Sequence, residues 1–334
     1  MRNLVIDGCV QIWPDADFAA IPDLGVSAFL LTTFDPYVDF NAAIAEMNTW
    51  HDRVQQYPDR LAIPLRPGDI TSAWEQGRTS LIFGCQGLDF IGNRLQHLEQ
   101  AWRLGLRLAQ PTYNDANLIG DGCLKPRNAG LTTFGKRVIA EMNRLGMVID
   151  LSHVGRRTSM EAIDLAAGPV VFSHANPRTV VKSPRNITNE QIQACAATGG
   201  VIGISPWGPL AWRHPETGRP KLADFIACIE YVVDLGGPAH VGVGTDLSIG
   251  TYDTTIHAEM VSAYPSVFAE YGRVVSADVG SPLRYVEGFD DFSGFARLPD
   301  ALHARGFGPE AIKGILGGNF LRVFEENWAK APAE

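Results

Sequence analysis

The stretch MVIDLSHVGRRTSMEAIDLAAGPVVFSHA, residues 147–175, contains two short apolar runs separated by a longer segment. The runs are rich in Val and Ile, and the segment between them carries Thr158 and Glu161, which fit a capping box at a helix start. Two buried strands joined through a helix form a parallel β-α-β unit. Both runs end in a Ser-His pair, so this unit would place His153 and His174 at the carboxyl ends of neighbouring strands.

The same alternation continues along the chain in both directions. Apolar runs of this kind occur at eight places, residues 4–10, 25–34, 80–87, 106–113, 147–154, 169–175, 200–207 and 240–247. Near-continuous apolar strands that alternate with helices are typical of a parallel sheet covered on both faces. Eight such units favour a (β/α)8 TIM barrel over a doubly wound sheet. We therefore expect residues 1–334 to form a single (β/α)8 domain.

The segments between these runs carry apolar residues at helical spacing, for example over residues 132–146. Thr188 and Gln191 fit a second capping box, and residues 311–328 are expected to close the chain as one amphipathic helix. Residues 60–70 form an extra strand-like piece. Residues 247–285 form a long insertion with many aromatic residues after the last strand, and we expect it to be a lid or binding loop at the barrel mouth.

Composition excludes several classes of protein. Of the 334 residues 46% are hydrophobic, and the formal net charge is −9 with no basic run of five residues, so a nucleic-acid partner is not expected. No apolar stretch approaches the roughly 18–20 residues that span a bilayer, and no signal-peptide pattern opens the chain. Five widely spread cysteines do not suggest a disulfide framework. A cytoplasmic enzyme without a membrane partner is the expectation.

In a barrel of this kind the active site lies at the carboxyl ends of the strands. Their side chains include two imidazoles and one carboxylate, which we expect to converge: Cys9, Gln11, Gln86, Tyr113, His153, His174 and Asp246. Imidazole and carboxylate are good ligands for zinc and similar divalent ions. A carboxylate beside an activated water can also carry its proton to a leaving group.

Several segments together resemble the renal or membrane dipeptidases, a family of amidohydrolase-like metallo-barrels. The resemblance is densest in residues 130–154, 169–178, 185–204, 240–246 and 317–324. It implies a (β/α)8 barrel that binds two zinc ions, cleaves dipeptides and often forms a homodimer. It also implies that His153 and His174 bind the second metal, that Asp246 shuttles a proton, and that Arg185 holds a substrate carboxylate.

The first metal site departs from the family pattern. Where the family's first strand ends in Asp-Gly-His-x-Asp, this chain has Asp7, Gly8, Cys9, Val10 and Gln11, and the bridging glutamate is Gln86. The histidine expected after the fourth strand is Tyr113. Two adjacent divalent cations need several anionic ligands, and two carboxylates are gone. We therefore expect one divalent ion, with zinc as the first choice, held by His153 and His174 together with Asp246 or with Cys9 as a thiolate. A metal-free pocket is the alternative.

Three functions follow from this altered site. The first is a hydrolase that cleaves a C–N bond in a small amino-acid derivative with a carboxylate. The second is a metal-independent tautomerase, eliminase or dehydratase that uses Tyr113 and the histidines as acid and base. The third is a non-catalytic binding protein. Gln11, Gln86 and Tyr252 are the expected substrate contacts beside Arg185, and the neutral amides predict a substrate whose amine is blocked, methylated or absent.

Overall fold

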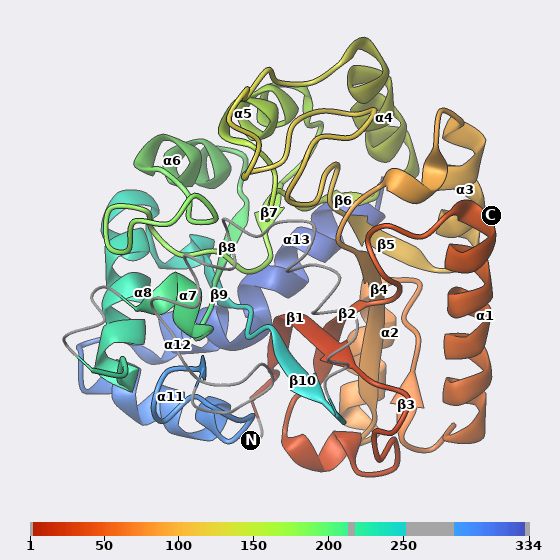
Figure 1. Ribbon diagram of the computed structural model, residues 1–334. Helices are drawn as coiled ribbons and strands as arrows, with labels where there is room; N and C mark the ends of the chain where they lie inside the picture. The colour runs from red at the N-terminus through yellow and green to blue at the C-terminus, as the bar shows by residue number, and fades with distance from the viewer. Residues whose placement is uncertain (1–2, 213–217, 252–283, 331–334) are drawn as a thin grey trace.

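The computed structural model describes residues 3–212, 218–251 and 284–330, and Figure 1 looks into a ring of strands surrounded by helices. Eight parallel strands are hydrogen-bonded in the order β6-β5-β4-β2-β1-β9-β8-β7. A single parallel bridge between Asp150 and Val171 joins the two ends of this order. The strands are β1 (Ile6–Ile12), β2 (Ala28–Thr32), β4 (Thr79–Cys85), β5 (Leu106–Ala109), β6 (Val148–Ile149), β7 (Val171–Phe172), β8 (Val201–Ile204) and β9 (Val241–Val243). All eight overlap the predicted runs, although β1 continues two residues further and β4 begins one residue earlier, and the (β/α)8 barrel is confirmed.

Two further strands lie beside the ring. β3 (Leu61–Ala62) pairs with β4, so only the first residues of the extra piece at 60–70 form a strand, and α2 begins at Pro67. β10 (Leu247–Ile249) pairs with β1 and opens the predicted insertion. Most of that insertion, residues 252–283, lies outside the described residues, and so does Tyr252.

Helices cover the outside of the ring in alternation with the strands (Figure 1). In the described part of the chain they are α1 (Phe40–Gln56), α2 (Pro67–Glu75), α3 (Leu95–Arg103), α4 (Thr133–Leu145), α5 (Arg156–Leu165), α6 (Asn189–Ala197), α7 (Gly208–Ala211), α8 (Leu222–Gly236), α11 (Gly294–His303), α12 (Pro309–Lys313) and α13 (Asn319–Trp328). None of them is both long enough and apolar enough to cross a membrane.

One of the two predicted capping boxes is confirmed. The Thr188 hydroxyl accepts from the Gln191 amide at the start of α6, and the Gln191 side chain accepts from the Thr188 amide. The box predicted at Thr158 is wrong, because α5 begins two residues earlier and Thr158 lies inside it. The Thr158 hydroxyl instead donates to the Asp121 carbonyl at 2.9 Å, so it fastens a loop to the helix.

The single closing helix predicted over residues 311–328 is also wrong. The helix is interrupted by a π turn at Gly314–Gly318, where Gly317 leaves helical geometry. A Cβ on Gly317 would lie 2.7 Å from the Ile6 backbone nitrogen, so the chain passes too close to β1 for any larger residue. The break lets α13 turn towards the barrel.

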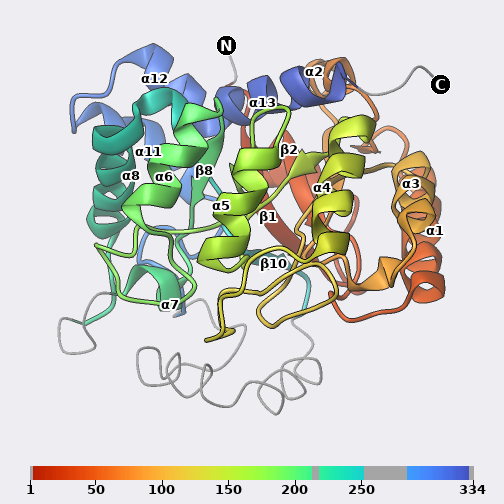
Figure 2. The same ribbon diagram turned by 90° about the horizontal axis from the view of Figure 1, so that it is seen from above.

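Helix α13 closes the amino-terminal end of the barrel. Phe320 and Phe324 are fully buried and belong to a cluster with residues at the starts of several strands, among them Ile6, Val171 and Val201. Figure 2 shows α13 across one end of the molecule and α7 at the other. Since one mouth is filled by apolar side chains, the carboxyl ends of the strands are left to form a site.

A close approach of backbones fixes the carboxyl end of β7. Added Cβ atoms on Gly8, Gly203 and Gly244 would lie 2.4, 2.0 and 1.9 Å from the same Ser173 carbonyl oxygen. Only glycine therefore lets the neighbouring strands press against Ser173. This packing immobilises the residue that precedes His174.

Candidate functional site

Two imidazoles meet at the carboxyl ends of β6 and β7. The Nε2 atoms of His153 and His174 are 2.9 Å apart, and both side chains are buried. Burial and the positive charge of Arg185 hold the pKa of each imidazole well below its usual range, so both rings are neutral. A neutral imidazole carries one proton, and its position decides what the two facing atoms can do.

Hydrogen bonds place that proton on Nδ1 of both rings. His153 Nδ1 lies 2.7 Å from Oδ1 of Asn114, which accepts. His174 Nδ1 lies 2.8 Å from the Ser173 hydroxyl oxygen, and that hydroxyl donates to Asp150 at 2.6 Å. Ser173 must therefore accept from His174. The two Nε2 atoms consequently face each other with lone pairs, an arrangement that a cation bound by both would stabilise.

The backbone is held in an unfavourable conformation at two of the predicted site residues. His153 and Asp246 have φ values of 63° and 56°, in the left-handed region that residues with a Cβ rarely adopt. Each is fixed by neighbours: the Cys123 amide donates to the His153 carbonyl at 2.7 Å, and the Tyr285 hydroxyl donates to the Asp246 carbonyl at 2.6 Å. Such conformations persist where the surroundings determine them, and they concentrate at functional sites.

Asp246 and Cys9 lie beside the imidazoles, at the ends of β9 and β1. The Cys9 Sγ is 3.5 Å from Oδ1 of Asp246 and 3.5 Å from Nε2 of Gln86. Burial raises the pKa of the Asp246 carboxyl to about 6, although Arg185 and hydrogen bonds from Cys9 and Gln11 lower it. Burial and the charge of Asp246 also raise the pKa of the Cys9 thiol well above its usual value, so without a cation it stays protonated.

Asp7 holds these strand ends together. Its carboxylate accepts from the amide of Cys9 at 3.2 Å and from the amide and hydroxyl of Thr245 at 2.7 and 2.5 Å. The side chain is fully buried and points to backbone groups of β1 and of the residues after β9. Asp7 therefore has a structural role at this mouth of the barrel.

The donor atoms fit one divalent ion. The ligand atoms of Cys9, His174 and Asp246 all lie within 4.8 Å of one another; His153 is not part of this group of three, but its Nε2 lies 2.9 Å from that of His174. Two imidazole ligands of a tetrahedral zinc ion are about 3.3 Å apart, close to the separation observed here. On the side of Gln11 and Gln86 the described residues offer neutral amides, which do not compensate a second cation.

Two cavities adjoin this centre, and no residue lines both of them. The larger, about 360 Å³, lies at the ends of β1, β2 and β4 and is lined by Gln11, Thr32, Gln86, Tyr113 and aromatic residues that include Trp50. The smaller, about 250 Å³, lies beyond His153 and is lined by Arg185. A substrate could therefore extend to both sides of the imidazole pair.

Arg185 and Tyr113 stand on opposite sides of the centre. Arg185 is 2% exposed, and its Nη2 donates to the His174 carbonyl at 2.7 Å, whereas its buried Nη1 has no hydrogen-bond partner among the described residues. Tyr113 stacks on His153 with ring centroids 4.2 Å apart, so it covers the imidazole instead of replacing it as a ligand. The structure thus brings together all the predicted site residues that it describes; Tyr252 lies outside the described residues.

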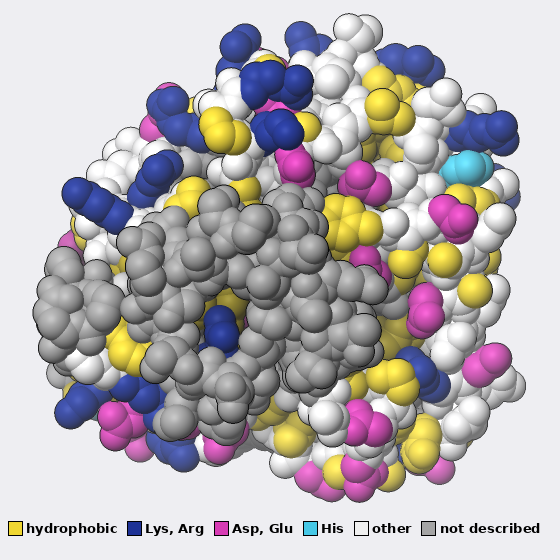
Figure 3. Space-filling model, viewed as in Figure 1, with side chains coloured by type: hydrophobic (Ala, Val, Ile, Leu, Met, Phe, Trp, Pro, Cys, Tyr) yellow, Lys and Arg dark blue, Asp and Glu magenta, His cyan; other side chains and the backbone are white. Residues whose placement is uncertain are grey.

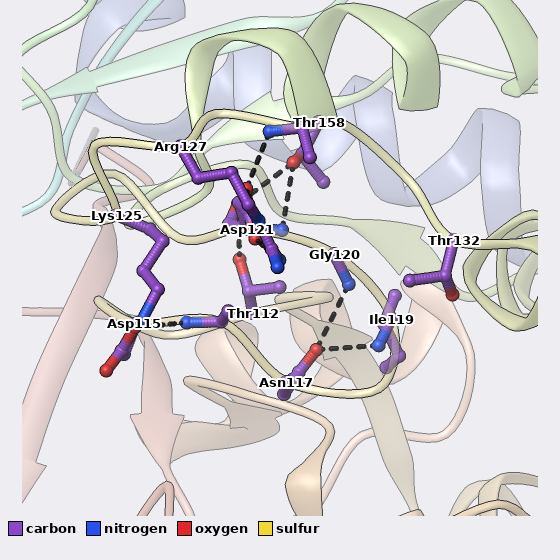
Figure 4. Close-up of polar contacts among 12 residues, drawn as sticks. Thr112, Asp115, Asn117, Ile119, Gly120, Asp121, Lys125, Arg127, Thr132 and Thr158 are labelled. Atoms are coloured by element: carbon purple, nitrogen blue, oxygen red, sulfur yellow. Dashed lines mark hydrogen bonds and ion pairs between the residues drawn. The ribbon is translucent and has the colours of Figure 1, made fainter.

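The loop between β5 and α4, residues 110–132, supplies Tyr113 and Asn114. Figure 4 shows the buried Asp121 at its centre, in contact with Arg127 and with Thr158 of α5. The Asp121 carboxylate also accepts from the Ala129 amide at 2.6 Å. The hydrogen bond and charge of Arg127 lower the pKa of Asp121, which is ionised at neutral pH. One buried carboxylate therefore organises the loop that orients His153.

We expect Asp121→Asn to lower the free energy of unfolding at pH 7 by about 1–3 kcal/mol, because a buried charge-assisted network loses its acceptor. A carboxyl with a depressed folded-state pKa adds stability above its unfolded pKa, and this stability is lost as the pH falls through the folded pKa. The difference between wild type and variant should thus shrink in acid, as urea unfolding at pH 7 and pH 3 would show. Asp115→Asn is the control, since Asp115 is 41% exposed; an equal loss there would contradict the role of Asp121.

Several functional contacts were missed in the sequence. Asn114, Ser173 and Asp150 set the imidazole tautomers, and Thr32 orients Gln86 by accepting from its Nε2 at 2.8 Å. Ser173 belongs to one of the quoted Ser-His pairs, and Asp150 lies two residues before the other, so the repeated pattern could have pointed to both. Nothing local distinguishes Asn114, because its role depends on a contact between two loops.

A (β/α)8 barrel with imidazole and carboxylate ligands at its strand ends is the architecture of metal-dependent hydrolases. The family model for membrane dipeptidase, peptidase family M19, matches residues 23–279. The chain therefore belongs to the membrane dipeptidase family, whose members bind divalent metal. The match begins after β1, so the strand that carries Cys9 and Gln11 lies outside it.

Individual relatives agree with this assignment. Dipeptidase verJ of Clonostachys rogersoniana is 27% identical over 291 residues, which make up 86% of this chain and 66% of that protein. Dipeptidase aclJ of Aspergillus oryzae is 28% identical over 277 residues, 82% of this chain and 58% of that protein. The chain thus spans about three fifths of the length of these curated relatives.

Solved structures show the same fold. An amidohydrolase from Pseudomonas aeruginosa superposes with a TM-score of 0.84 at 28% identity, covering 98% of this chain and 97% of that one. The probable dipeptidase PvdM from the same organism gives a TM-score of 0.80 at 19% identity, covering 99% and 96%. At that lower identity the likeness establishes the barrel alone.

Proposed function

We propose that the protein is a dipeptidase-like hydrolase that cleaves the C–N bond of an amide in a small amino-acid derivative. The observation that carries this proposal is the pair of Nε2 lone pairs of His153 and His174, 2.9 Å apart beside Asp246. Membership of the membrane dipeptidase family supports the same chemistry.

One divalent ion, with zinc as the first choice, would be held by His153, His174 and Cys9. When bound, it would lower the pKa of a water and polarise the scissile carbonyl. Cys9 would bind as a thiolate, because a cation reverses the electrostatic surroundings that keep its proton in place. Asp246 would then remain free to hold a proton.

Three side chains of the protein would carry out proton transfer, carboxylate binding and positioning of the substrate. Asp246 is half-buried, faces Cys9 and Gln11, and can take a proton from water and return it to the leaving nitrogen. Arg185 presents an unpartnered Nη1 to the smaller cavity, where it can bind a carboxylate. Tyr113 covers His153 and lines the larger cavity, so it separates the two halves of a bound substrate.

The substrate's amine is blocked, methylated or absent in this proposal. Next to the strand ends the larger cavity presents Gln11, Thr32 and Gln86, none of which carries a charge. Its acidic residues, Asp35 and Glu46, belong to α1 or the loop before it, and Glu46 is exposed. An ammonium group at the strand ends would lack the carboxylates that would compensate it, whereas an acyl group could accept hydrogen bonds from the amides.

Matched substrates test this choice. We expect N-acetyl-Ala-Ala to be hydrolysed with a kcat/KM at least about tenfold above that of free Ala-Ala, a difference of about 1.4 kcal/mol in transition-state binding. Gln86→Glu should shift the preference towards the free dipeptide, and Gln76→Glu, an exposed change on the outside of the barrel, should not. Equal or faster turnover of Ala-Ala by the wild type would show that the amine is not excluded.

A metal-independent tautomerase or eliminase is the second candidate. The observation that favours it is Tyr113 stacked on His153 at 4.2 Å, which places a phenol and an imidazole on one substrate. Proton abstraction needs a positioned acid and base but no paired metals. Activity that survives complete chelation of the protein would select this candidate. A cytoplasmic location and a homodimer also remain predictions, which cell fractionation and light scattering would test.

A further inference from the structure

The smaller cavity is unusually basic. It is formed by the loops that follow β5, β6 and β7, and its lining contains no acidic residue but four basic ones: Lys125, Arg156, Arg178 and Arg185. Figure 3 shows Lys and Arg side chains gathered on this side of the molecule, over α5. Its volume of about 250 Å³ corresponds to about eight water molecules at 30 Å³ each, or one amino-acid residue.

Two of these four charges are already compensated by acidic side chains. Lys125 Nζ lies 2.8 Å from Oδ1 of Asp115, within the loop shown in Figure 4. Arg156 pairs with Glu190, and both side chains are about half exposed. These two residues therefore add little free charge to the cavity.

The other two charges, on Arg185 and Arg178, have no acidic partner among the described residues. The Arg185 guanidinium is buried and its Nη1 is unsatisfied. A buried N–H without an acceptor is costly, so this group can gain from binding an anion. The Arg178 side chain is exposed, and no hydrogen bond or ion pair occupies it in the described part of the chain.

The loop between β7 and α6 holds the backbones of the two arginines in a closed turn. Pro177 and Ile187 form a backbone bridge across it, and the Arg178 amide donates to the Ile187 carbonyl at 2.7 Å. Asn186 secures the same turn by donating to the Val181 carbonyl at 3.0 Å. Arg178 and Arg185 both lie between the two bridged residues, one directly after Pro177 and the other two residues before Ile187, so their backbones are held on the same closed turn.

Both guanidinium groups also lie close to one point of the cavity wall. The charges of Arg185 and Arg178 lower the pKa of the Cys123 thiol, although burial raises it to about 11. The Cys123 side chain lines the cavity and lies 3.5 Å from Asn114 Oδ1, which orients His153. The two cations therefore face the cavity at the side where it meets the imidazole pair.

We propose that this cavity binds an acidic residue, aspartate-like or glutamate-like, on the carboxyl side of the scissile bond. Its main-chain carboxylate would bind Arg185, and its side-chain carboxylate would bind Arg178. The placement of this acidic residue on the carboxyl side of the scissile bond rests on the proposed hydrolysis. The affinity of the cavity for two carboxylates does not. Arg178 is then a specificity-determining residue, and a substrate with a neutral side chain would leave its guanidinium unpaired.

Dicarboxylates without a C–N bond cannot be hydrolysed, so they test binding alone at the two-anion site, which is formed by Arg178 and Arg185. Calorimetric titration of the wild-type protein with succinate, glutarate and adipate samples three spacings between the carboxylates, and pentanoate supplies the matched ligand with one. We expect the best dicarboxylate to bind at least about tenfold more tightly than pentanoate, as one additional charge-assisted contact implies. Arg178→Gln should reduce this ratio to within about threefold.

The control variant is Arg157→Gln, which removes the same charge from a neighbouring position. Arg157 pairs with Glu161 and does not line the cavity, so the dicarboxylate preference should persist. Thermal unfolding of all three proteins establishes that each is folded. Equal binding of pentanoate and every dicarboxylate, or a preference that Arg178→Gln leaves intact, overturns the proposal. A protein that prefers dicarboxylates but hydrolyses no amide would refute the hydrolase and retain the two-anion site.

Discussion

The Asp246→Asn variant is expected to lose about 10²- to 10⁴-fold in kcat, the contribution of a positioned acid–base group. The amide keeps the size of the side chain and can keep its contacts with Cys9 and Gln11, but it can neither accept nor return a proton at neutral pH. Steady-state kinetics on the best N-acyl substrate measure the loss.

The same variant should bind ligands as the wild type does. Arg185 and the smaller cavity do not include Asp246, so the dissociation constant of a carboxylate ligand should change by less than about threefold. Comparable losses in affinity and in kcat would mean that Asp246 acts in binding or in folding. Unchanged turnover would exclude it as the proton carrier and would revive the non-catalytic alternative.

Metal content is the second measurement with a large expected effect. Protein prepared without added metal should contain about one equivalent of a divalent ion per chain, and His153→Ala or His174→Ala should abolish it, because each removes one of few ligands. Cys9→Ser should weaken binding by at least about tenfold, since a serine hydroxyl does not ionise as a thiol does. Elemental analysis after dialysis against a weak chelator measures the metal content of the wild type, of the two histidine variants and of Cys9→Ser.

Cys195→Ser is the matched control for the thiol. Cys195 is a buried cysteine of α6 whose Sγ lies near the Val170 carbonyl, away from the imidazoles, so metal content should be unchanged. Two equivalents in the wild type would refute the charge argument based on Gln11 and Gln86. Protein that takes up no ion even after reconstitution would leave metal-free acid–base chemistry as the working mechanism.

The barrel could be predicted from the sequence because each strand is buried on both faces. Runs such as residues 80–87 are mainly apolar, and the segments between them have helical spacing, so the elements and their order follow from the local pattern. The break at Gly317 could not be predicted in this way. Its cause is the Ile6 backbone, which is distant in sequence.

The part of the candidate site that lies at the carboxyl ends of the strands could be predicted, because these ends converge. Cys9, His153, His174 and Asp246 follow from the barrel, since parallel strands present their carboxyl ends at one mouth. The groups that set the tautomers follow from tertiary contacts, and Asn114 reaches His153 from a loop whose course depends on the buried Asp121. The error at Thr158 has the same origin, because that hydroxyl fastens the same loop to α5.

The two cavities share no lining residue. This separation bears on how the sequence of the protein could have diverged. The larger cavity is built mainly from β1, β2, β4 and their loops, and the smaller from the loops after β5, β6 and β7. Substitutions on one half can therefore accumulate without disturbing the other. Cys9, Gln11 and Gln86, where the sequence departs from the pattern expected for the family, lie in or beside the first half, whereas His153, His174 and Arg185, which match that pattern, lie in or beside the second. Selection could therefore change the acyl part of the substrate, which the larger cavity would bind, while recognition of the residue on the carboxyl side of the scissile bond stayed constant.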